Sequence, residues 1–349
     1  SYVPVIPDAL IRLDQVSWKE EPKKRGEPDF KLAQGFPNTI NAPSYILQNT
    51  PTNERPPLNV GVVFSGGPAS GGHNVIAALF HSLKKIHSGS RLFGFLNGPS
   101  GIIQNESKEL HENEIPFYLN QGGFDWIGSG RTKVETAEHL AACKKSCKAL
   151  ELDGLVFIGG DDTNTNAAVL AEYFLKEECK TCVIGVPKTI DGDLRSPEIE
   201  ISFGFDTACK TYAEMIGNIA RDARSAKKYY HFIKLMGRSA SHITLECALA
   251  THPNLAWVGE EGCTLSYIVN HTADLIIKRS EAGKEYGVVL VPEGLIEFIP
   301  EIRSLIKAFN EMKEPNADQL LSKEKEVFKE LPEKIQKQML LDRDAHGNI

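Results

Sequence analysis

The sequence lacks several features that define large classes of protein. It has no uninterrupted apolar run of about 18 residues, which is the length that a membrane helix needs. It begins Ser-Tyr-Val-Pro, without the charged and apolar regions of a signal peptide. Its formal net charge of -7 supplies no basic surface for nucleic acid. We therefore expect a cytoplasmic protein that binds neither membranes nor nucleic acid.

Cysteines are few and odd in number. Seven cysteines dispersed over 349 residues favour reduced thiols over a disulfide framework. Two pairs, Cys143 with Cys147 and Cys179 with Cys182, could together supply four thiolates to a zinc ion. We disfavour this zinc site because Cys182 enters an apolar strand and neither pair has the flanking glycines of a zinc knuckle.

The remaining composition is that of an ordinary globular protein. With 41% hydrophobic and 24% charged residues, the chain is long enough for two domains. Residues 1–57 carry prolines, charges and scattered apolar residues, which indicates an N-terminal extension. From Leu58 to about residue 300, strand and helix patterns alternate, which predicts an α/β fold with mainly parallel sheets. Residues 301–349 interleave lysines with glutamates and predict a solvated helical hairpin.

The stretch PKTIDGD at residues 187–193 is the most informative segment. It follows the apolar run 183–186, which predicts a buried parallel strand. Lys188, Asp191 and Asp193 would then lie at the carboxyl end of this strand, where open α/β sheets bind ligands. A turn in which the aspartates cap backbone N–H groups would explain the carboxylates equally well. Taken alone, the stretch leaves both interpretations open.

A glycine-rich turn, SGGPASGGHN, joins the predicted strand 59–64 to the predicted helix 75–86. Backbone N–H groups of Gly66 and Gly67 could approach an anion closely there, with the help of the helix dipole. The pattern matches neither GxGxxG nor GxxxxGK[ST], so a dinucleotide fold and a P-loop are not indicated. A turn needed only for tight packing remains the alternative.

A second turn, GGDDTN, follows the predicted strand 155–158. Adjacent carboxylates such as Asp161 and Asp162 repel one another unless a cation or hydrogen-bond donors hold them. Mg²⁺ is a natural partner, and N-capping of a helix expected from about Asn166 is the alternative.

Further cations and carboxylates occupy comparable positions. Arg131 lies among small residues and suits a phosphate, although a solvated arginine would fit the sequence as well. Glu293 directly follows one apolar strand, and Arg238 lies three residues beyond the end of another. Capping alone does not readily explain so many strand ends with small and charged residues, which favours a shared binding site.

The motifs GGDDTN, PKTIDGD, MGRSASH and PEG, in this order after an SGG loop, resemble those of phosphofructokinases. The similarity covers about residues 58–302. The run KKYYHFIKLMGRSASHITLECALATHPN is most similar to the long-chain, pyrophosphate-dependent branch. The resemblance implies two Rossmann-like domains with the active site in the cleft between them. Residues 58–205 would bind pyrophosphate and Mg²⁺, and residues 206–300 would bind fructose 6-phosphate.

The resemblance also implies the reaction and its residues. Phosphate would pass reversibly from pyrophosphate to the 1-hydroxyl of fructose 6-phosphate, giving fructose 1,6-bisphosphate, with Asp191 as general base. Catalysis would be assisted by Lys188, Thr189 and Arg131, and Mg²⁺ would lie near Asp161 and Asp193. The residues implied to bind pyrophosphate are Gly66, Gly67, Arg131, Asp162 and Lys188. Those implied to bind the sugar phosphate are Thr189, Asp191, Asp193, Tyr229, Met236, Gly237, Arg238 and Glu293.

Two residues decide which phosphoryl donor we expect. In ATP-using relatives, the positions of Asp162 and Lys188 are typically glycine. Asp162 would put bulk and negative charge where the α-phosphate of a nucleotide lies, and Lys188 would add a cation near a short diphosphate. We therefore predict pyrophosphate as donor, with an ATP-dependent 6-phosphofructokinase as the alternative.

The chain also departs from the family pattern. Tyr229 stands where bacterial ATP enzymes have an arginine that reaches the sugar phosphate of a neighbouring subunit. No later arginine motif for the 6-phosphate follows Glu293, and the long-chain branch normally continues well past Ile349. We therefore expect the family fold to be incomplete at the C-terminus.

Three further alternatives concern assembly and lineage. The protein would assemble as a homo-oligomer such as a dimer, or with a related subunit. A regulatory subunit of a hetero-oligomer is disfavoured because the catalytic motifs are intact. The lipid and NAD kinase lineage shares the GGD turn, but it does not usually combine TIDGD with MGR.

Overall fold

The computed structural model describes residues 8–21, 30–40, 42–49, 55–195, 199, 202–312 and 315–342. The chain forms two compact units. The first comprises Ser1–Thr189 with Leu194–Gly204, and the second comprises Ile190–Asp193 with Phe205–Ile349. Residues 190–193 and 301–349 thus belong to the second unit. Parts of the expected N-terminal extension and of the C-terminal segment lie outside the described residues, namely 1–7, 22–29, 41, 50–54, 313–314 and 343–349.

The first unit is built on a six-stranded sheet with the order β5-β4-β3-β7-β8, and β6 pairs with β3. All neighbouring strands are parallel except β4 and β5. The strands are β3 (Asn59–Ser65), β4 (Arg91–Phe95), β5 (Ser107–Glu109), β6 (Ser129–Gly130), β7 (Gly154–Gly159) and β8 (Cys182–Pro187). The prediction of an α/β fold with mainly parallel sheets is confirmed.

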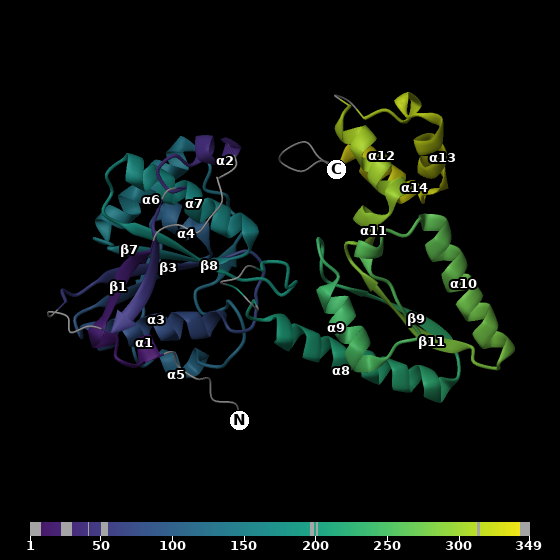
Figure 1. The fold of residues 1–349 in the computed structure, drawn as a ribbon, viewed down its shortest axis with the longest axis horizontal. Coiled ribbons are helices and arrows are strands. Elements are labelled where there is room, and N and C mark those ends of the chain that lie inside the picture. Colours follow the sequence, from purple (N-terminus) through teal and green to yellow (C-terminus); the bar gives the residue numbers. More distant parts are fainter. Residues whose placement is uncertain are drawn as a thin grey trace. The chain divides into compact units, whose positions relative to one another are not determined.

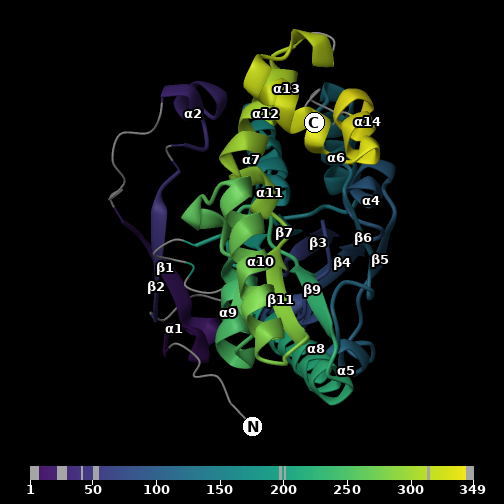
Figure 2. The same ribbon diagram turned by 90° about the vertical axis from the view of Figure 1, so that its right-hand side faces the viewer.

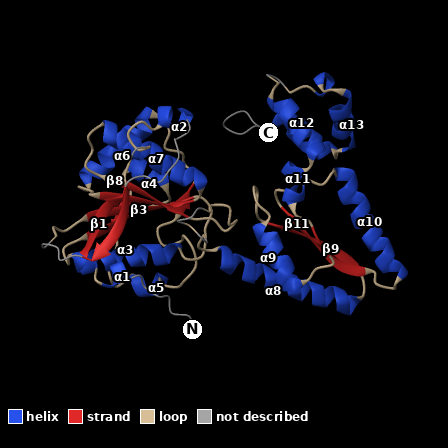
Figure 3. Ribbon diagram, viewed as in Figure 1, coloured by secondary structure: helices blue, strands red, loops and turns tan. Residues whose placement is uncertain are grey.

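Helices cover both faces of this sheet (Figures 1 and 3). Val62 and Phe64 of β3 point into a core shared with α3 (Gly72–Ile86), whereas Val63 between them points into the opposite core. This alternation of faces along an apolar strand is why the sheet is buried on both sides. The opposite core is closed by α4 (Pro99–Gln104), α6 (Ala137–Ala149) and α7 (Asp161–Lys176).

The order of the strands creates a switch point between β3 and β7. The chain leaves β3 for α3 on one face, and it leaves the neighbouring β7 for α7 on the other face. Crevices at such switch points, outside the carboxyl ends of the strands, are where ligands bind in open α/β sheets. The glycine-rich turn and the GGDD turn both lie at this edge.

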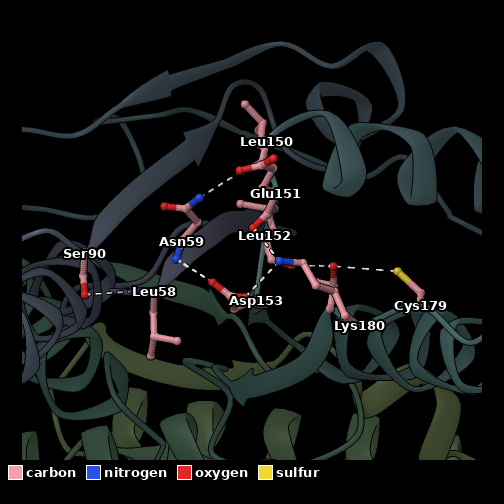
Figure 4. A network of polar contacts seen from close by, with 10 residues as sticks. Leu58, Asn59, Ser90, Leu150, Glu151, Leu152, Asp153, Cys179 and Lys180 are labelled. Atoms are coloured by element: carbon pink, nitrogen blue, oxygen red, sulfur yellow. Dashed lines mark hydrogen bonds and ion pairs between the residues drawn. The ribbon is translucent and has the colours of Figure 1, made fainter. Parts of the chain in front are cut away.

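Polar contacts hold the opposite edge of the sheet together (Figure 4). Asp153, just before β7, accepts hydrogen bonds from the backbone N–H of Asn59 at 2.9 Å and from the Lys180 ammonium at 3.1 Å. Asn59 also donates through its side chain to the Leu150 carbonyl at 3.3 Å. These bonds join the amino ends of β3, β7 and β8, and so fix the register in which their carboxyl ends meet.

The second unit contains a smaller parallel sheet with the order β10-β11-β9. Its strands are β9 (Tyr229–Leu235), β10 (Leu255–Ala256) and β11 (Tyr286–Pro292). On one face, α8 (Phe205–Ala226) and α9 (His242–Thr251) share a core with Leu235, Val288 and Leu290. On the other face, α10 (Leu265–Glu281) packs near Val289 and Trp257.

The C-terminal part of the second unit is a small helical group (Figures 1 and 2). It comprises α11 (Leu295–Phe298), α12 (Pro300–Asn310), η3 (Ala317–Gln319), α13 (Ser322–Glu330) and α14 (Glu333–Leu341). The predicted helical character of this segment is seen, but it is not a solvated hairpin. Its apolar side chains build a core of their own, formed by Leu305, Phe309, Leu320, Phe328 and Met339.

The N-terminal extension contains elements that the sequence did not indicate. Strands β1 (Val16–Glu21) and β2 (Ser44–Asn49) pair as an antiparallel ribbon, and three short helical segments flank them: α1 (Asp8–Ile11), η1 (Leu13–Gln15) and α2 (Phe30–Gly35). Glu172 of α7 accepts hydrogen bonds from the backbone N–H groups of Asn38 and Thr39, at 3.1 and 2.9 Å. None of the helices in the described ranges combines the length and apolar character needed to cross a bilayer.

Candidate functional site

The glycine-rich turn after β3 is held against β6. The Gly66 N–H donates to the Gly130 carbonyl at 2.9 Å, and the Ser129 hydroxyl donates to the Gly66 carbonyl at 2.8 Å. Arg131 follows directly, and its Nη2 lies 3.8 Å from the point where a Cβ on Gly67 would stand. The turn therefore brings Gly66, Gly67 and the exposed Arg131 together, as a phosphate site requires.

The two aspartates of GGDD lie in the first turn of α7. The helix begins at Asp161, with Gly160 as N-cap, so the expected start near Asn166 was wrong. The side chain of Asn164 donates to the carbonyls of Gly159 and Gly160, at 2.9 and 2.7 Å, and ties this turn to β7. Asp161 and Asp162 are exposed at the positive end of the helix dipole, which favours carboxylates and extends the helix to include them.

Lys188 is a buried cation of the first unit. Its side chain is 7% exposed, and its ammonium donates to the Gly67 carbonyl at 2.6 Å. The same ammonium lies 5.5 Å from the centroid of the Phe124 ring. Its backbone N–H donates to the Gly159 carbonyl at 2.8 Å, which extends the pairing of β8 with β7. Lys188 thus lies between the two turns at the switch point.

Thr189 is the last residue of PKTIDGD that belongs to the first unit. Its backbone N–H donates to the Ser202 hydroxyl at 2.7 Å. The next residue, Ile190, packs against the core of the second unit. The chain therefore passes from one unit to the other in the middle of this stretch.

Asp191 and Asp193 flank a tight turn in the second unit. Gly192 has a φ of +71°, and a Cβ on it would lie 3.1 Å from the Phe205 ring, so the turn needs glycine. His242 Nδ1 lies 3.0 Å from the Gly192 carbonyl, to which it donates. The Ser239 hydroxyl donates to Asp193 Oδ2 at 2.8 Å. The turn is thereby attached to the loop that follows β9.

Asp191 has an electrostatic environment suited to a base. Burial raises the pKa of its carboxyl above the ordinary value, and the nearby charges of Asp193 and Glu293 raise it further. Arg238 opposes this shift through its charge and a backbone hydrogen bond. A carboxylate whose pKa is moved toward neutrality accepts a proton more readily at neutral pH.

The loops after β9 and β11 hold each other. The Glu293 N–H donates to the Leu235 carbonyl at 2.7 Å, and the Gly294 N–H donates to the Gly237 carbonyl at 3.0 Å. Arg238 and Glu293 therefore emerge from neighbouring strand ends with exposed side chains, and Met236 beside them is 48% exposed. These residues form the cationic and polar edge that the sequence predicted at the carboxyl ends of the strands.

Tyr229 lies elsewhere. It is the first residue of β9, so the whole strand separates it from Met236. Its side chain is 64% exposed, and the Lys228 ammonium lies 5.4 Å from its ring centroid. Within this chain, Tyr229 is not gathered with the other candidate residues.

Sequence reasoning missed residues that support both sites. In the second unit, Glu260 accepts a hydrogen bond from the Ser241 N–H at 2.8 Å, and the Ser241 hydroxyl accepts one from the Gly259 N–H at 2.9 Å. Burial raises the pKa of Glu260, but the hydrogen bonds from Ser241 outweigh it, so the pKa is lowered overall. In the first unit, Phe124 contacts Lys188 and was visible only as part of a GGFD turn. No sequence signal connects these partners, because they come from distant segments.

Metal ligands are not preassembled in the described part of either unit. Within the described ranges, no group of three or more His, Cys, Asp and Glu side chains is arranged to hold a metal ion. Asp161 and Asp193 belong to different units. Mg²⁺ commonly binds through one or two carboxylates together with substrate phosphates, so exposed carboxylates of this kind fit it.

The four candidate zinc thiolates do not form a cluster. Cys143 and Cys147 are fully buried in the core between α6 and the sheet, and burial raises the pKa of each thiol to about 12. Both side chains therefore serve as packing residues of this core.

The chain is similar in sequence to known phosphofructokinases and phosphotransferases. A family model described as phosphofructokinase matches residues 59–339. The pyrophosphate–fructose 6-phosphate 1-phosphotransferase subunit beta 2 of Arabidopsis thaliana is 51% identical over 339 residues, which cover 93% of this chain and 59% of that relative. The pyrophosphate–fructose 6-phosphate 1-phosphotransferase of Porphyromonas gingivalis is 46% identical over 375 residues, which cover 100% of this chain and 67% of that relative.

A solved structure shows the same fold. The pyrophosphate-dependent phosphofructokinase of Marinobacter aquaeolei has a TM-score of 0.59 and 19% identity, covering 72% of this chain and 65% of that one. The chain spans about three fifths of the length of its Arabidopsis relative, 59%. With the family model matched from residue 59 to 339 and relatives at 46–51% identity, the chain belongs to the phosphofructokinase family.

Proposed function

We propose that the protein transfers phosphate reversibly from pyrophosphate to the 1-hydroxyl of fructose 6-phosphate, giving fructose 1,6-bisphosphate and phosphate. The relatives from Arabidopsis thaliana and Porphyromonas gingivalis carry this activity in their names. Because the chain spans only 59% of the first of them, the activity is assigned to the whole protein. The observation that carries the proposal is the setting of Asp191 beside Arg238, Asp193 and Glu293.

Asp191 would act as the general base. Its carboxylate would take the proton of the sugar 1-hydroxyl as the hydroxyl oxygen attacks phosphorus. The raised pKa of Asp191 supports this role, because a base works best when its pKa lies near the operating pH. Thr189 would help to hold the sugar or the transferred group.

Pyrophosphate would lie over the glycine-rich turn of the first unit. The backbone N–H of Gly67 would donate to its oxygens, and Arg131 would offer its guanidinium. Gly66 would line the site, but its own N–H is already paired with the Gly130 carbonyl. Lys188 would supply a cation from a nearly dry position, where its charge acts more strongly than in water. Asp162, exposed at the start of α7, would repel the additional phosphate of a nucleotide.

Mg²⁺ would be held by Asp161 and Asp193 together with the phosphates of the donor. When bound, it neutralises negative charge on the oxygens of the transferred phosphoryl group. The exposure of both carboxylates supports this assignment, since they must reach a ligand outside the chain.

Fructose 6-phosphate would bind at the edge formed by the loops after β9 and β11. Arg238 would pair with the sugar phosphate, Glu293 would accept from sugar hydroxyls, and Met236 with Gly237 would contact the sugar. Tyr229 would take part only by reaching a second subunit. Assembly with another copy or a related subunit is therefore part of the proposal, and the Arabidopsis relative is itself named a beta subunit.

We also propose that the protein works in the cytoplasm.

The test compares phosphoryl donors on the full chain. Formation of fructose 1,6-bisphosphate is measured with pyrophosphate and with ATP at equal Mg²⁺. We expect turnover with pyrophosphate, little with ATP, and none in Asp191→Ala. Equal turnover with both donors would contradict the assignment of the donor, and full activity of Asp191→Ala would contradict the assignment of the base.

A further inference from the structure

The Lys188 ammonium is held by a backbone carbonyl and by an aromatic ring. A lysine side chain is long and flexible, so an ammonium that must distinguish one anion from another has to be fixed by its surroundings. Lys188 donates to the Gly67 carbonyl at 2.6 Å, and its ammonium lies 5.5 Å from the Phe124 ring centroid. The face of an aromatic ring attracts a cation, and this attraction strengthens where water is excluded, as at the 7% exposed Lys188.

The Phe124 ring is itself immobilised. It is 4% exposed and stacks on Phe64 of β3, with ring centroids 4.1 Å apart and planes inclined by 4°. It also lies against the glycine-rich turn, because a Cβ on Gly72 would stand 2.3 Å from it. The ring therefore touches the turn and the lysine at once.

His73 fixes the segment that carries Phe124. Its imidazole is 1% exposed and lies at the end of the glycine-rich turn, in the first turn of α3. Nδ1 donates to the Gln121 carbonyl at 2.6 Å, and Nε2 accepts from the Trp126 N–H at 3.1 Å. One side chain thus bridges both ends of the segment 121–126, with Phe124 between them.

We propose that Phe124 is a positioning residue for the phosphoryl donor: its ring holds the Lys188 ammonium against Gly67 and thereby sets the affinity for pyrophosphate. His73 supports this by holding the segment from which the ring projects. The ligand in this inference rests on the proposed function. The contact between the Phe124 ring and Lys188 is seen in the structure and does not depend on the proposed function.

The test replaces Phe124 in the full chain by phenylalanines with one, two and three ring fluorines. Fluorine withdraws electron density from the ring face with little change in size, so the attraction for a cation weakens in steps. We expect the KM for pyrophosphate to rise in the same steps, to about tenfold for three fluorines. The KM for fructose 6-phosphate should stay unchanged.

Phe80 provides a matched control. It belongs to the same apolar core as Phe124, is 3% exposed, and has the Lys84 ammonium 5.6 Å from its ring centroid. Fluorination at Phe80 should leave the KM for pyrophosphate unchanged. In a Lys188→Met background, the series at Phe124 should lose its effect. Equal effects at both rings, or an effect that persists without Lys188, would overturn the proposal.

A second measurement separates this inference from the proposed function. The reactivity of Lys188 toward an acylating reagent can be followed by mass spectrometry without any ligand. We expect Phe124→Leu to make Lys188 react several-fold faster, and Phe124→Tyr, which keeps the ring, to leave the rate unchanged. If the protein failed to use pyrophosphate, the proposed function would fall. Unchanged labelling of Lys188 in Phe124→Leu would overturn the positioning role.

Discussion

Replacing Asp162 and Lys188 together by glycine should move the protein from pyrophosphate toward ATP. Lys188 offers a buried ammonium beside the glycine-rich turn, and Asp162 offers an exposed carboxylate at the start of α7. Removing the ammonium takes away the cation near a short diphosphate. Removing the carboxylate takes away charge and bulk that oppose a longer nucleotide phosphate chain.

The expected loss of pyrophosphate activity is the value of one hydrogen bond from the Lys188 ammonium to pyrophosphate. A hydrogen bond made by a charged group contributes about 1.5–3 kcal/mol, which corresponds to about 10–150-fold in kcat/KM for pyrophosphate. Loss of the buried Lys188 stem would also destabilise the fold, by about 2 kcal/mol. Asp162→Gly should cost only about 1 kcal/mol, through the lost helix-dipole interaction and the poor helix propensity of glycine.

Fructose 1,6-bisphosphate formation with each donor gives the readout, with thermal unfolding as a check on folding. Lys188→Met is the control for the stem, because it fills the space without the charge. We expect it to lower kcat/KM for pyrophosphate by the same factor of about 10–150, with less destabilisation than Lys188→Gly. If the folded double variant kept the wild-type ratio of pyrophosphate to ATP activity, the reasoning about donor choice would be refuted.

Three other predictions concern the base, the loops and the metal. Asp191→Asn should lower kcat about 10²–10⁴-fold. Because the pKa of Asp191 is raised in the folded state, the stability of the wild type falls as pH rises from the unfolded-state pKa through the folded-state pKa. Over that pH range, the free energy of urea unfolding of Asp191→Asn should increasingly exceed that of the wild type. Gly294→Ala should destabilise the fold by about 3 kcal/mol, because its Cβ would stand 1.7 Å from the Arg238 carbonyl oxygen. Gly217→Ala should stabilise it by about 0.5–1 kcal/mol, because no atom lies near this position of α8. Urea unfolding measures both. Excess chelator should abolish transfer without moving the thermal midpoint, and Mg²⁺ should restore it.

The parallel sheet was predictable because its signal is local. An apolar run such as 59–64 or 155–158 is buried on both faces, and glycine or charged residues end it within a few positions. The N-terminal ribbon β1–β2 carries no such signal, since its residues are largely exposed and its strands pair across a long separation in sequence. The start of α7 was missed because two adjacent carboxylates look like a turn, although they are favourable in a first helical turn.

The sequence predicted those candidate residues that lie next to an apolar strand in the chain. Lys188, Asp191 and Arg238 were visible because each charge directly follows or lies close behind an apolar strand. Their supports were not visible. The Phe124 ring meets Lys188 across 64 positions of sequence, a spacing that no periodicity can reveal.

The seven residues PKTIDGD are divided between the two units. Lys188 is fixed by Gly67 and Gly159 of the first unit, whereas Asp191 follows Ile190, which is anchored in the core of the second unit. The cation that we propose to select the donor and the residue that we propose as the base are therefore close in sequence but are held by different units. Changes at Phe124 should act on the affinity for the donor, and changes at Asp191 on proton transfer. We therefore expect the two proposed functions of this strand end to be separable by mutation, because the chain crosses from one unit to the other between Lys188 and Asp191.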